Sequence, residues 1–91
     1  MIRSFKSSET ETLFAELKTR RFQGIEKVAV RKLQQLHAAK SLNDLRGAGN
    51  SLEALKDDRK GQYAIRVNDQ YRLCFEWEDG EAYDVEIVDY H

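Results

Sequence analysis

Residues 63–87 decide the fold and read YAIRVNDQYRLCFEWEDGEAYDVEI. Apolar and polar residues alternate in three runs, which is the pattern of strands with one buried face. The apolar sets are Tyr63, Ile65 and Val67, then Tyr71, Leu73, Phe75 and Trp77, then Tyr83, Val85 and Ile87. These runs predict three half-buried antiparallel strands.

The first predicted hairpin turns over residues 68–70. This loop places Ile65 opposite Leu73, whereas a slip of one residue would turn an apolar set towards water. It also places Arg66 opposite Arg72 on the other face, where two like charges destabilise the pair. Two explanations stay open: acids compensate the charge, with Glu86 opposite Arg72, or an anion binds there.

The second predicted hairpin turns over residues 78–80 and places Phe75 opposite Tyr83. The glycine that ends this loop takes the left-handed conformation that closes it with a bulge. A two-residue turn at 79–80 is rejected, because it would set Phe75 opposite Asp84. The alternation breaks at residues 87–88, where we expect a bulge.

The N-terminal half predicts two helices. Ser7 or Ser8 caps the first helix, with acids in its first turn where the helix dipole favours them. Its apolar stripe comprises Leu13, Phe14 and Leu17. The second helix covers about residues 25–39, and its stripe comprises Ile25, Val28, Ala29, Leu33 and Leu36. Four polar residues lie outside that stripe: Lys27, Arg31, Lys32 and Gln35.

The prediction is one α+β domain over residues 1–91, in the order β-α-α-β-β-β. Met1–Phe5 forms the first short strand, with Ile2 and Phe5 buried, and residues 52–56 form a further one. Two helices cover one face of a small antiparallel sheet. The opposite face is partly bare and carries Arg66, Arg72, Asp84 and Glu86.

Composition excludes several classes of protein. Ninety-one residues suit one modest core and one shallow site. Cys74 is the single cysteine, so a disulfide within the chain and a cysteine-rich zinc site are excluded. No apolar run follows Met1 as in a signal peptide, and none approaches the ~18 residues of a membrane span. We therefore expect a reduced, cytoplasmic protein.

The net charge of −1 hides a strong segregation. Residues 1–72 hold all 15 Lys and Arg with 9 acids, a net charge of +6, whereas residues 73–91 hold 7 acids and no Lys or Arg. Such asymmetry favours a basic face that meets phosphates. The alternative is that the acids only solvate a C-terminal hairpin.

Two further polar features are candidates for chemistry. Residues 56–61 read KDDRKG, which is either a solvated turn or a source of phosphate-binding cations, with Lys56 directed to the face of Arg72. Asp89, Tyr90 and His91 close the chain after the last strand. His91 suits acid–base work near neutral pH, although a frayed polar end would carry the same residues.

Several motifs in one order resemble the HigB toxins of the RelE superfamily. They are LKDDRKGQY at 55–63, Arg72, DGEAY at 79–83 and VDYH at 88–91. The match is close over roughly the last 40 residues, and the helical half fits in length and order. The resemblance implies a RelE-like fold and ribosome-dependent cleavage of mRNA without metal or cofactor, in which the RNA 2′-hydroxyl attacks the neighbouring phosphate.

The resemblance also assigns site residues, position by position. The family's terminal acid, tyrosine and histidine fall on Asp89, Tyr90 and His91, its loop lysine on Lys56 and its strand arginine on Arg72. We expect His91 to transfer protons and Tyr90 to stack on a base or share the proton transfer. We expect Lys56 and Arg72 to clamp the phosphate. The expected RNA-backbone contacts are Arg59, Lys60 and Arg66.

The chain departs from the family pattern at two places. Some HigB toxins carry His-Pro where this chain has Glu53-Ala54, so Glu53 acts as a base, orients Lys56 or merely occupies a strand. The usual Trp before the strand arginine is Tyr71, a mild core change. His37 lies within a predicted helix and does not replace the missing histidine.

The resemblance implies a helix-turn-helix HigA-type antitoxin as partner, besides the decoding site of the 30S ribosomal subunit and mRNA. Nothing in the chain resembles a DNA-recognition helix, so operator DNA is contacted only through the antitoxin. Two other functions stay open: a ParE-like gyrase poison, which the terminal Tyr90-His91 disfavours, and a non-enzymatic antitoxin-binding co-repressor.

Overall fold

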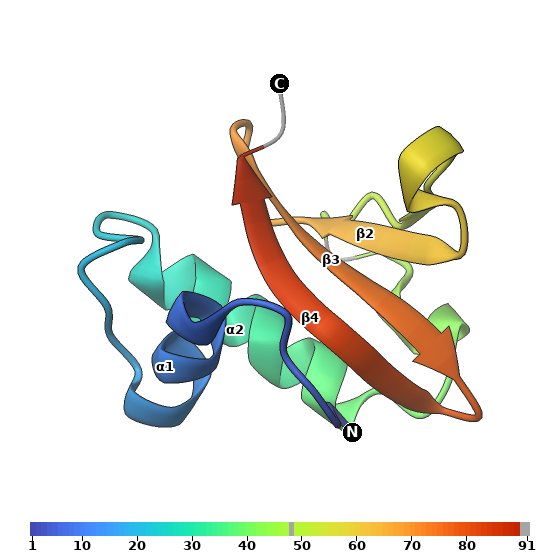
Figure 1. Ribbon diagram of the computed structural model, residues 1–91, viewed down its shortest axis with the longest axis horizontal. Helices are drawn as coiled ribbons and strands as arrows, with labels where there is room; N and C mark the ends of the chain where they lie inside the picture. The colour runs from blue at the N-terminus through green and yellow to red at the C-terminus, as the bar shows by residue number, and fades with distance from the viewer. Residues whose placement is uncertain (48, 90–91) are drawn as a thin grey trace.

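The computed structural model describes residues 1–47 and 49–89 (Figure 1). The elements are α1 (Ser8–Glu16), α2 (Glu26–Ala38), η1 (Leu42–Leu45), β1 (Glu53–Ala54), η2 (Asp57–Arg59), β2 (Gln62–Arg66), β3 (Tyr71–Glu78) and β4 (Glu81–Asp89). The strands form one antiparallel sheet in the order β1-β2-β3-β4. The α+β class, with two helices packed on the sheet, is confirmed.

The two short strands of the prediction are less regular than expected. Met1–Phe5 does not form a full strand: Ile2 and Phe5 make isolated parallel bridges to Ala82 and Val85 of β4. Ile2 is buried, and Phe5 is half-buried against the core. The strand predicted over residues 52–56 shrinks to the two residues of β1.

Both helices form close to their predicted bounds. Ser7 caps α1, because its Oγ accepts a hydrogen bond from the Thr10 backbone N–H at 3.2 Å. The helix stops at Leu17, whose φ of 65° is left-handed and whose side chain is 58% exposed. The predicted burial of Leu17 in the apolar stripe is therefore wrong, since the residue has already left the helix.

Lys32 of α2 is buried, although it lies outside the predicted apolar stripe. Residues 42–47 and 49–52 lie along this flank of the helix, and Lys32 Nζ donates a hydrogen bond to Asn50 Oδ1. Asn50 is also buried, and its Nδ2 donates to Gln35 Oε1 and to the Leu45 carbonyl. Burial lowers the pKa of Lys32, with Arg31 and Arg66 acting in the same direction.

The β2–β3 hairpin has the predicted register. Ile65 pairs with Leu73, Tyr63 pairs with Phe75, and Arg66 lies opposite Arg72. The apolar members of these pairs enter the main core, which the two helices cover from one side of the sheet.

The β3–β4 hairpin corrects the predicted register. Glu78 pairs with Glu81, so the turn has two residues, and Asp79 and Gly80 both have positive φ, 52° and 80°. This is the conformation that favours a glycine at the second position. The turn that was rejected from the sequence is therefore the one that forms.

A bulge in β4 makes that turn compatible with a buried face. The register shifts between Cys74 and Glu76, where Asp84 has a φ of 51°. The extra residue returns Val85 to the core, whereas Tyr83 before it pairs with Glu76 and is 37% exposed. The predicted burial of Tyr83 and the predicted bulge at residues 87–88 are thus wrong.

The second face of the sheet carries a small apolar cluster of its own. Leu55, Ala64 and Cys74 are buried there, with Val88 packed against them. The chain from Leu55 through η2 therefore folds over this face, opposite the two helices (Figure 1). This face, named the open face below, is less bare than predicted.

No helix in the described ranges has the length and apolar character needed to cross a membrane.

Candidate active site

Two arginines lie side by side at the end of the β2–β3 hairpin. Arg66 and Arg72 are direct partners in the ladder and point to the open face. Arg66 Nη2 pairs with Asp69 Oδ1, and Arg72 Nη1 donates to the carbonyls of Asn68 (2.6 Å) and Tyr71 (3.1 Å). Acceptors of the intervening loop thus hold both guanidinium groups.

The predicted compensation of Arg72 by Glu86 is wrong. Because of the two-residue turn and the bulge, Glu86 pairs with Cys74, and Val88 is the partner of Arg72 in β4. Glu86 instead accepts from Arg59 Nη1 at 3.3 Å and forms an ion pair with Lys6 Nζ at 3.6 Å.

The corrected register brings Arg72 to the end of β4. Asp89 lies opposite Tyr71, one position from the pair of Arg72 and Val88. Its Oδ2 accepts a hydrogen bond from Gln70 Nε2 at 2.9 Å. Asp89 and Arg72 are therefore close along the ladder but alternate in face, since Asp89 pairs with Tyr71 and Arg72 with Val88. The predicted Tyr90 and His91 lie outside the described residues.

Charged residues also surround Cys74 in the middle of the open face. Burial raises the pKa of Cys74 to about 11. Glu86 and Glu53 also raise this pKa, whereas Arg59 and, less strongly, Arg72 lower it. A neutral, buried thiol is a poor nucleophile. Cys74 is thus a structural residue, around which the charged groups of the open face are arranged.

The remaining predicted site residues lie around η2 and β1. Glu53 pairs with Ala64 and so shares the open face with Arg72. Lys56 precedes η2 and Lys60 follows it, both with exposed side chains. Strand alternation places Leu55, and not Lys56, against Ala64 and Cys74. Arg59 is held over the sheet by Glu86 and by Gln62 Oε1 at 3.0 Å.

Three contacts in this site were not predicted from the sequence. Gln70 holds Asp89, the Asn68 carbonyl holds Arg72, and Glu86 holds Arg59. Loop side chains such as Gln70 gave no periodic signal, and Glu86 was assigned to the wrong partner because the bulge was placed elsewhere. His37 has a structural role: its Nδ1 accepts from the Ile2 backbone N–H at 3.1 Å.

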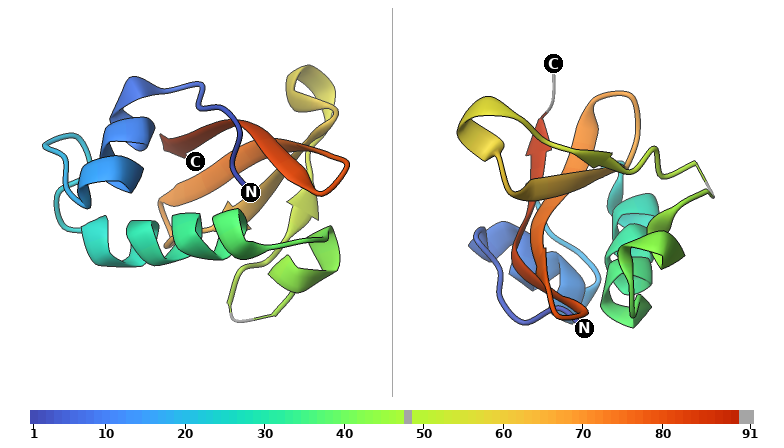
Figure 2. Two further views of the ribbon diagram at one scale, coloured as in Figure 1. Left: turned by 90° about the horizontal axis from the view of Figure 1, so that it is seen from below. Right: turned by 90° about the vertical axis from the view of Figure 1, so that its right-hand side faces the viewer.

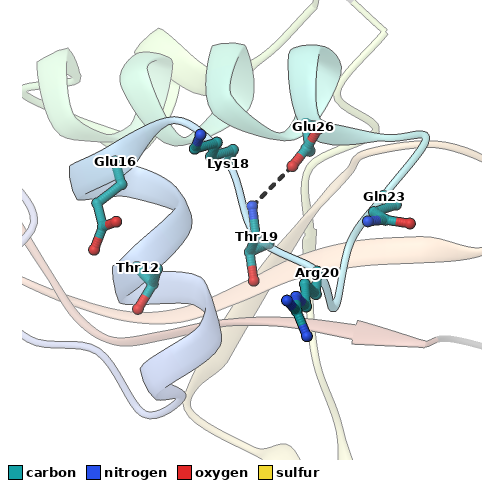
Figure 3. A pocket seen from close by; sticks show the side chains of 7 residues that line it. All are labelled: Thr12, Glu16, Lys18, Thr19, Arg20, Gln23 and Glu26. Carbon is teal, nitrogen blue, oxygen red and sulfur yellow. Dashed lines mark hydrogen bonds between the residues drawn. The ribbon is translucent and has the colours of Figure 1, made fainter.

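A metal site is not apparent in the described ranges. Within residues 1–47 and 49–89, no three His, Cys, Asp or Glu side chains are grouped to hold a metal ion. A shallow cavity of about 610 Å³ lies between α1, the α1–α2 loop and the start of α2 (Figure 3). None of the predicted site residues lines it.

Known proteins resemble the chain in sequence over its whole length. A family model described as the RelE-like toxin of the type II toxin-antitoxin system HigB matches residues 3–91. The chain belongs to this HigB-like toxin family. It is 42% identical over 85 residues to Toxin HigB-1 of Vibrio cholerae, which covers 90% of each protein. It is 32% identical over 93 residues to Endoribonuclease HigB of Proteus vulgaris, with full coverage of both.

Solved structures extend the likeness of this HigB-like chain to the fold. The YoeB dimer of Staphylococcus aureus superposes with a TM-score of 0.61 at 23% identity, covering 99% of this chain and 97% of the other. The YoeB/ParE toxin of Agrobacterium tumefaciens gives 0.58 at 19% identity, covering 99% and 96%. The RelE-like fold expected from the sequence is confirmed.

Proposed function

We propose that this HigB-like toxin is a metal-independent endoribonuclease that cuts mRNA on the ribosome and so inhibits translation. The name of the Proteus vulgaris relative, Endoribonuclease HigB, supports the reaction class. The observation that carries the proposal is the place of Arg72. Its guanidinium lies on the open face, and its β4 partner Val88 directly precedes Asp89, Tyr90 and His91 in the chain.

The reaction needs a base for the 2′-hydroxyl, cations for the phosphate and an acid for the departing 5′-oxygen. In the proposal His91 moves protons, and Tyr90 stacks on a base or shares this work. Asp89 supports this end of the site, because Gln70 holds its carboxylate. Proton transfer by a well-placed side chain contributes about 10²–10⁴-fold to the rate.

Arg72 suits the phosphate because its guanidinium is held in a fixed orientation. Its Nη1 donates to two backbone carbonyls, which fix one edge of the group. The planar group has five N–H donors in a fork that suits bidentate contact with a phosphate. Arg66, Arg59, Lys60 and Lys56 add positive charge around it, and Glu53 acts as a base or orients a cation.

The proposed partners follow from the family. They are a HigA-type helix-turn-helix antitoxin, the 30S decoding site and mRNA, with operator DNA contacted only through the antitoxin and the toxin acting in the cytoplasm. A related fold, YoeB of Staphylococcus aureus, forms a heterotetrameric complex with YefM.

The test is to map cuts in mRNA on translating ribosomes with the wild type and with His91→Ala, Tyr90→Ala and Arg72→Ala. We expect cleavage and growth arrest to be lost in the His91 and Arg72 variants, and to persist in Lys40→Ala, an exposed change far from the site. Growth arrest that survives all three site substitutions would refute the enzymatic proposal. Inhibition of purified gyrase would instead support the ParE-like function.

A further inference from the structure

Five cations gather on the α1–α2 loop and the first turns of α2. They are Lys18, Arg20, Arg21, Lys27 and Arg31, and all five are exposed. Within the described parts of the chain none of them takes part in a salt bridge. By contrast, Arg3, Lys6, Arg59 and Arg66 each pair with a carboxylate. Within the described residues, the α1–α2 loop therefore presents cations that no carboxylate pairs directly.

Glu26, the acidic residue of this segment, stabilises the loop by a hydrogen bond. Glu26 Oε2 accepts a hydrogen bond from the Thr19 backbone N–H at 2.8 Å (Figure 3). Phe22 anchors the loop, since only 3% of it is exposed, and the Arg21 guanidinium lies 5.7 Å from the centre of its ring. A loop fixed in this way loses little conformational freedom when it binds a partner.

The loop packs against the end of the sheet that carries the proposed site. Phe22 meets Tyr71 edge to face, with 6.0 Å between ring centroids, and Tyr71 is the ladder partner of Asp89. The left view of Figure 2 shows the loop and the end of β4 towards one end of the molecule, with the end of α2 and the β3–β4 turn towards the other. The cations nevertheless lie on the helical side, not on the open face.

We propose that the cations of the α1–α2 loop bind the phosphate backbone of folded ribosomal RNA beside the mRNA site. This inference rests on the proposed ribosome-dependent function. In that function the mRNA strand occupies the open face, so a surface on the helical side faces the part of the ribosome that surrounds the mRNA. Cations spread over a loop and a helix suit the dense, extended charge of folded RNA, which sequence-independent contacts recognise.

The test measures binding of the toxin to purified 30S subunits at a series of salt concentrations. All proteins carry His91→Ala, so that cleavage plays no part in the result. The loop variant is Lys18→Gln with Arg20→Gln. The matched control is Lys40→Gln with Arg46→Gln, which removes one lysine and one arginine, both exposed, from the other end of the molecule. There the Lys40 carbonyl lies against Gly80 of the β3–β4 turn.

We expect the loop variant to bind 30S subunits about tenfold more weakly near physiological salt, and the control to bind like the parent. Each lost phosphate contact flattens the slope of log affinity against log salt by about 0.7–0.9, so the loop variant should lose roughly 1.5. In the otherwise wild-type protein, the loop variant should retain the pattern of mRNA cuts with a raised KM for ribosomes.

Three results would overturn the inference. If the loop variant and the control lose 30S binding equally, the weaker binding comes from the lower net charge and not from the loop. Unchanged 30S binding with weaker binding of a single-stranded RNA oligonucleotide assigns the cations to mRNA. Unchanged 30S binding with impaired binding of the antitoxin assigns them to that protein. A failure of the proposed function is distinct, because then the parent protein itself does not bind 30S subunits.

Discussion

Arg72 lies directly opposite Arg66 in the β2–β3 ladder, and the loop between them supplies a different acceptor to each. Asp69 neutralises Arg66, whereas Arg72 donates to the carbonyls of Asn68 and Tyr71. The carboxylate of Asp69 is 99% exposed, so its ion pair adds little to stability. The arrangement keeps two cations adjacent on the open face, and two backbone carbonyls orient the guanidinium of Arg72.

Replacing Arg72 by Lys should therefore damage the reaction more than the fold. The lysine keeps the charge but has no planar fork to hold two carbonyls and a phosphate together. We expect cleavage of ribosome-bound mRNA to fall at least about tenfold, while the free energy of unfolding changes by less than about 1 kcal/mol. Arg66→Lys is the matched control, and it should lower the cleavage rate less. Equal losses in the two variants would contradict a special role of Arg72.

The buried thiol of Cys74 should make stability depend on pH in the alkaline range. Burial raises its pKa from 9.0 to about 11 in the folded chain. Between these values the unfolded chain releases the proton and the folded chain keeps it, so the free energy of unfolding falls as pH rises. Below pH 9 this contribution is fully present.

Cys74→Ala supplies the control, because other alkaline groups, Lys32 among them, titrate in both proteins. Urea unfolding at pH values from 8 to 11 should show the wild type losing stability faster than the variant over the upper part of this range. Parallel curves for the two proteins would mean that the folded thiol ionises as easily as the unfolded one.

The sequence predicted the β2–β3 hairpin correctly because one face of these strands alternates without interruption. Ile65 and Leu73 enter the core, and their register follows from the need to bury both. The β3–β4 hairpin was wrong for a physical reason. Alternation was assumed to continue through Asp84, but this residue takes a positive φ and belongs to a bulge that reverses the faces on either side.

The contacts around the predicted site residues could not be derived from the sequence. Arg72 lies beside the end of β4, where its partner is Val88 and not the predicted Glu86. Lys32 was placed outside the core because helical periodicity ignores what covers the flank of a helix. Asn50 accepts the hydrogen bond of the Lys32 ammonium group. It lies in an irregular segment, where the sequence shows no periodic pattern.

Asn50→Ala should be among the more destabilising single changes outside the apolar core. The side chain joins Lys32, Gln35 and the Leu45 carbonyl at a buried position, and its own backbone carbonyl accepts from the Arg66 N–H. Its loss leaves buried polar groups without this partner, at a cost of about 2–3 kcal/mol. Denaturant unfolding measures the change. Asn43→Ala, at an exposed position of η1, should cost less than about 0.5 kcal/mol, and similar losses in both would contradict the role of the buried network.

Leu17→Gly should stabilise the protein, although it removes a large apolar side chain. Leu17 ends α1 with a φ of 65°, a conformation that costs a residue with a Cβ about 1 kcal/mol and costs glycine little. Its side chain is 58% exposed, so little burial is lost. We expect a gain of about 0.5–1 kcal/mol, which raises Tm by roughly 2–6 °C in a chain of this size. Leu17→Ala separates the two effects, because alanine removes the side chain but keeps the Cβ, and its Tm should not exceed that of the wild type. A lower Tm for the glycine variant than for the alanine variant would show that backbone strain at the end of α1 is not what the substitution relieves.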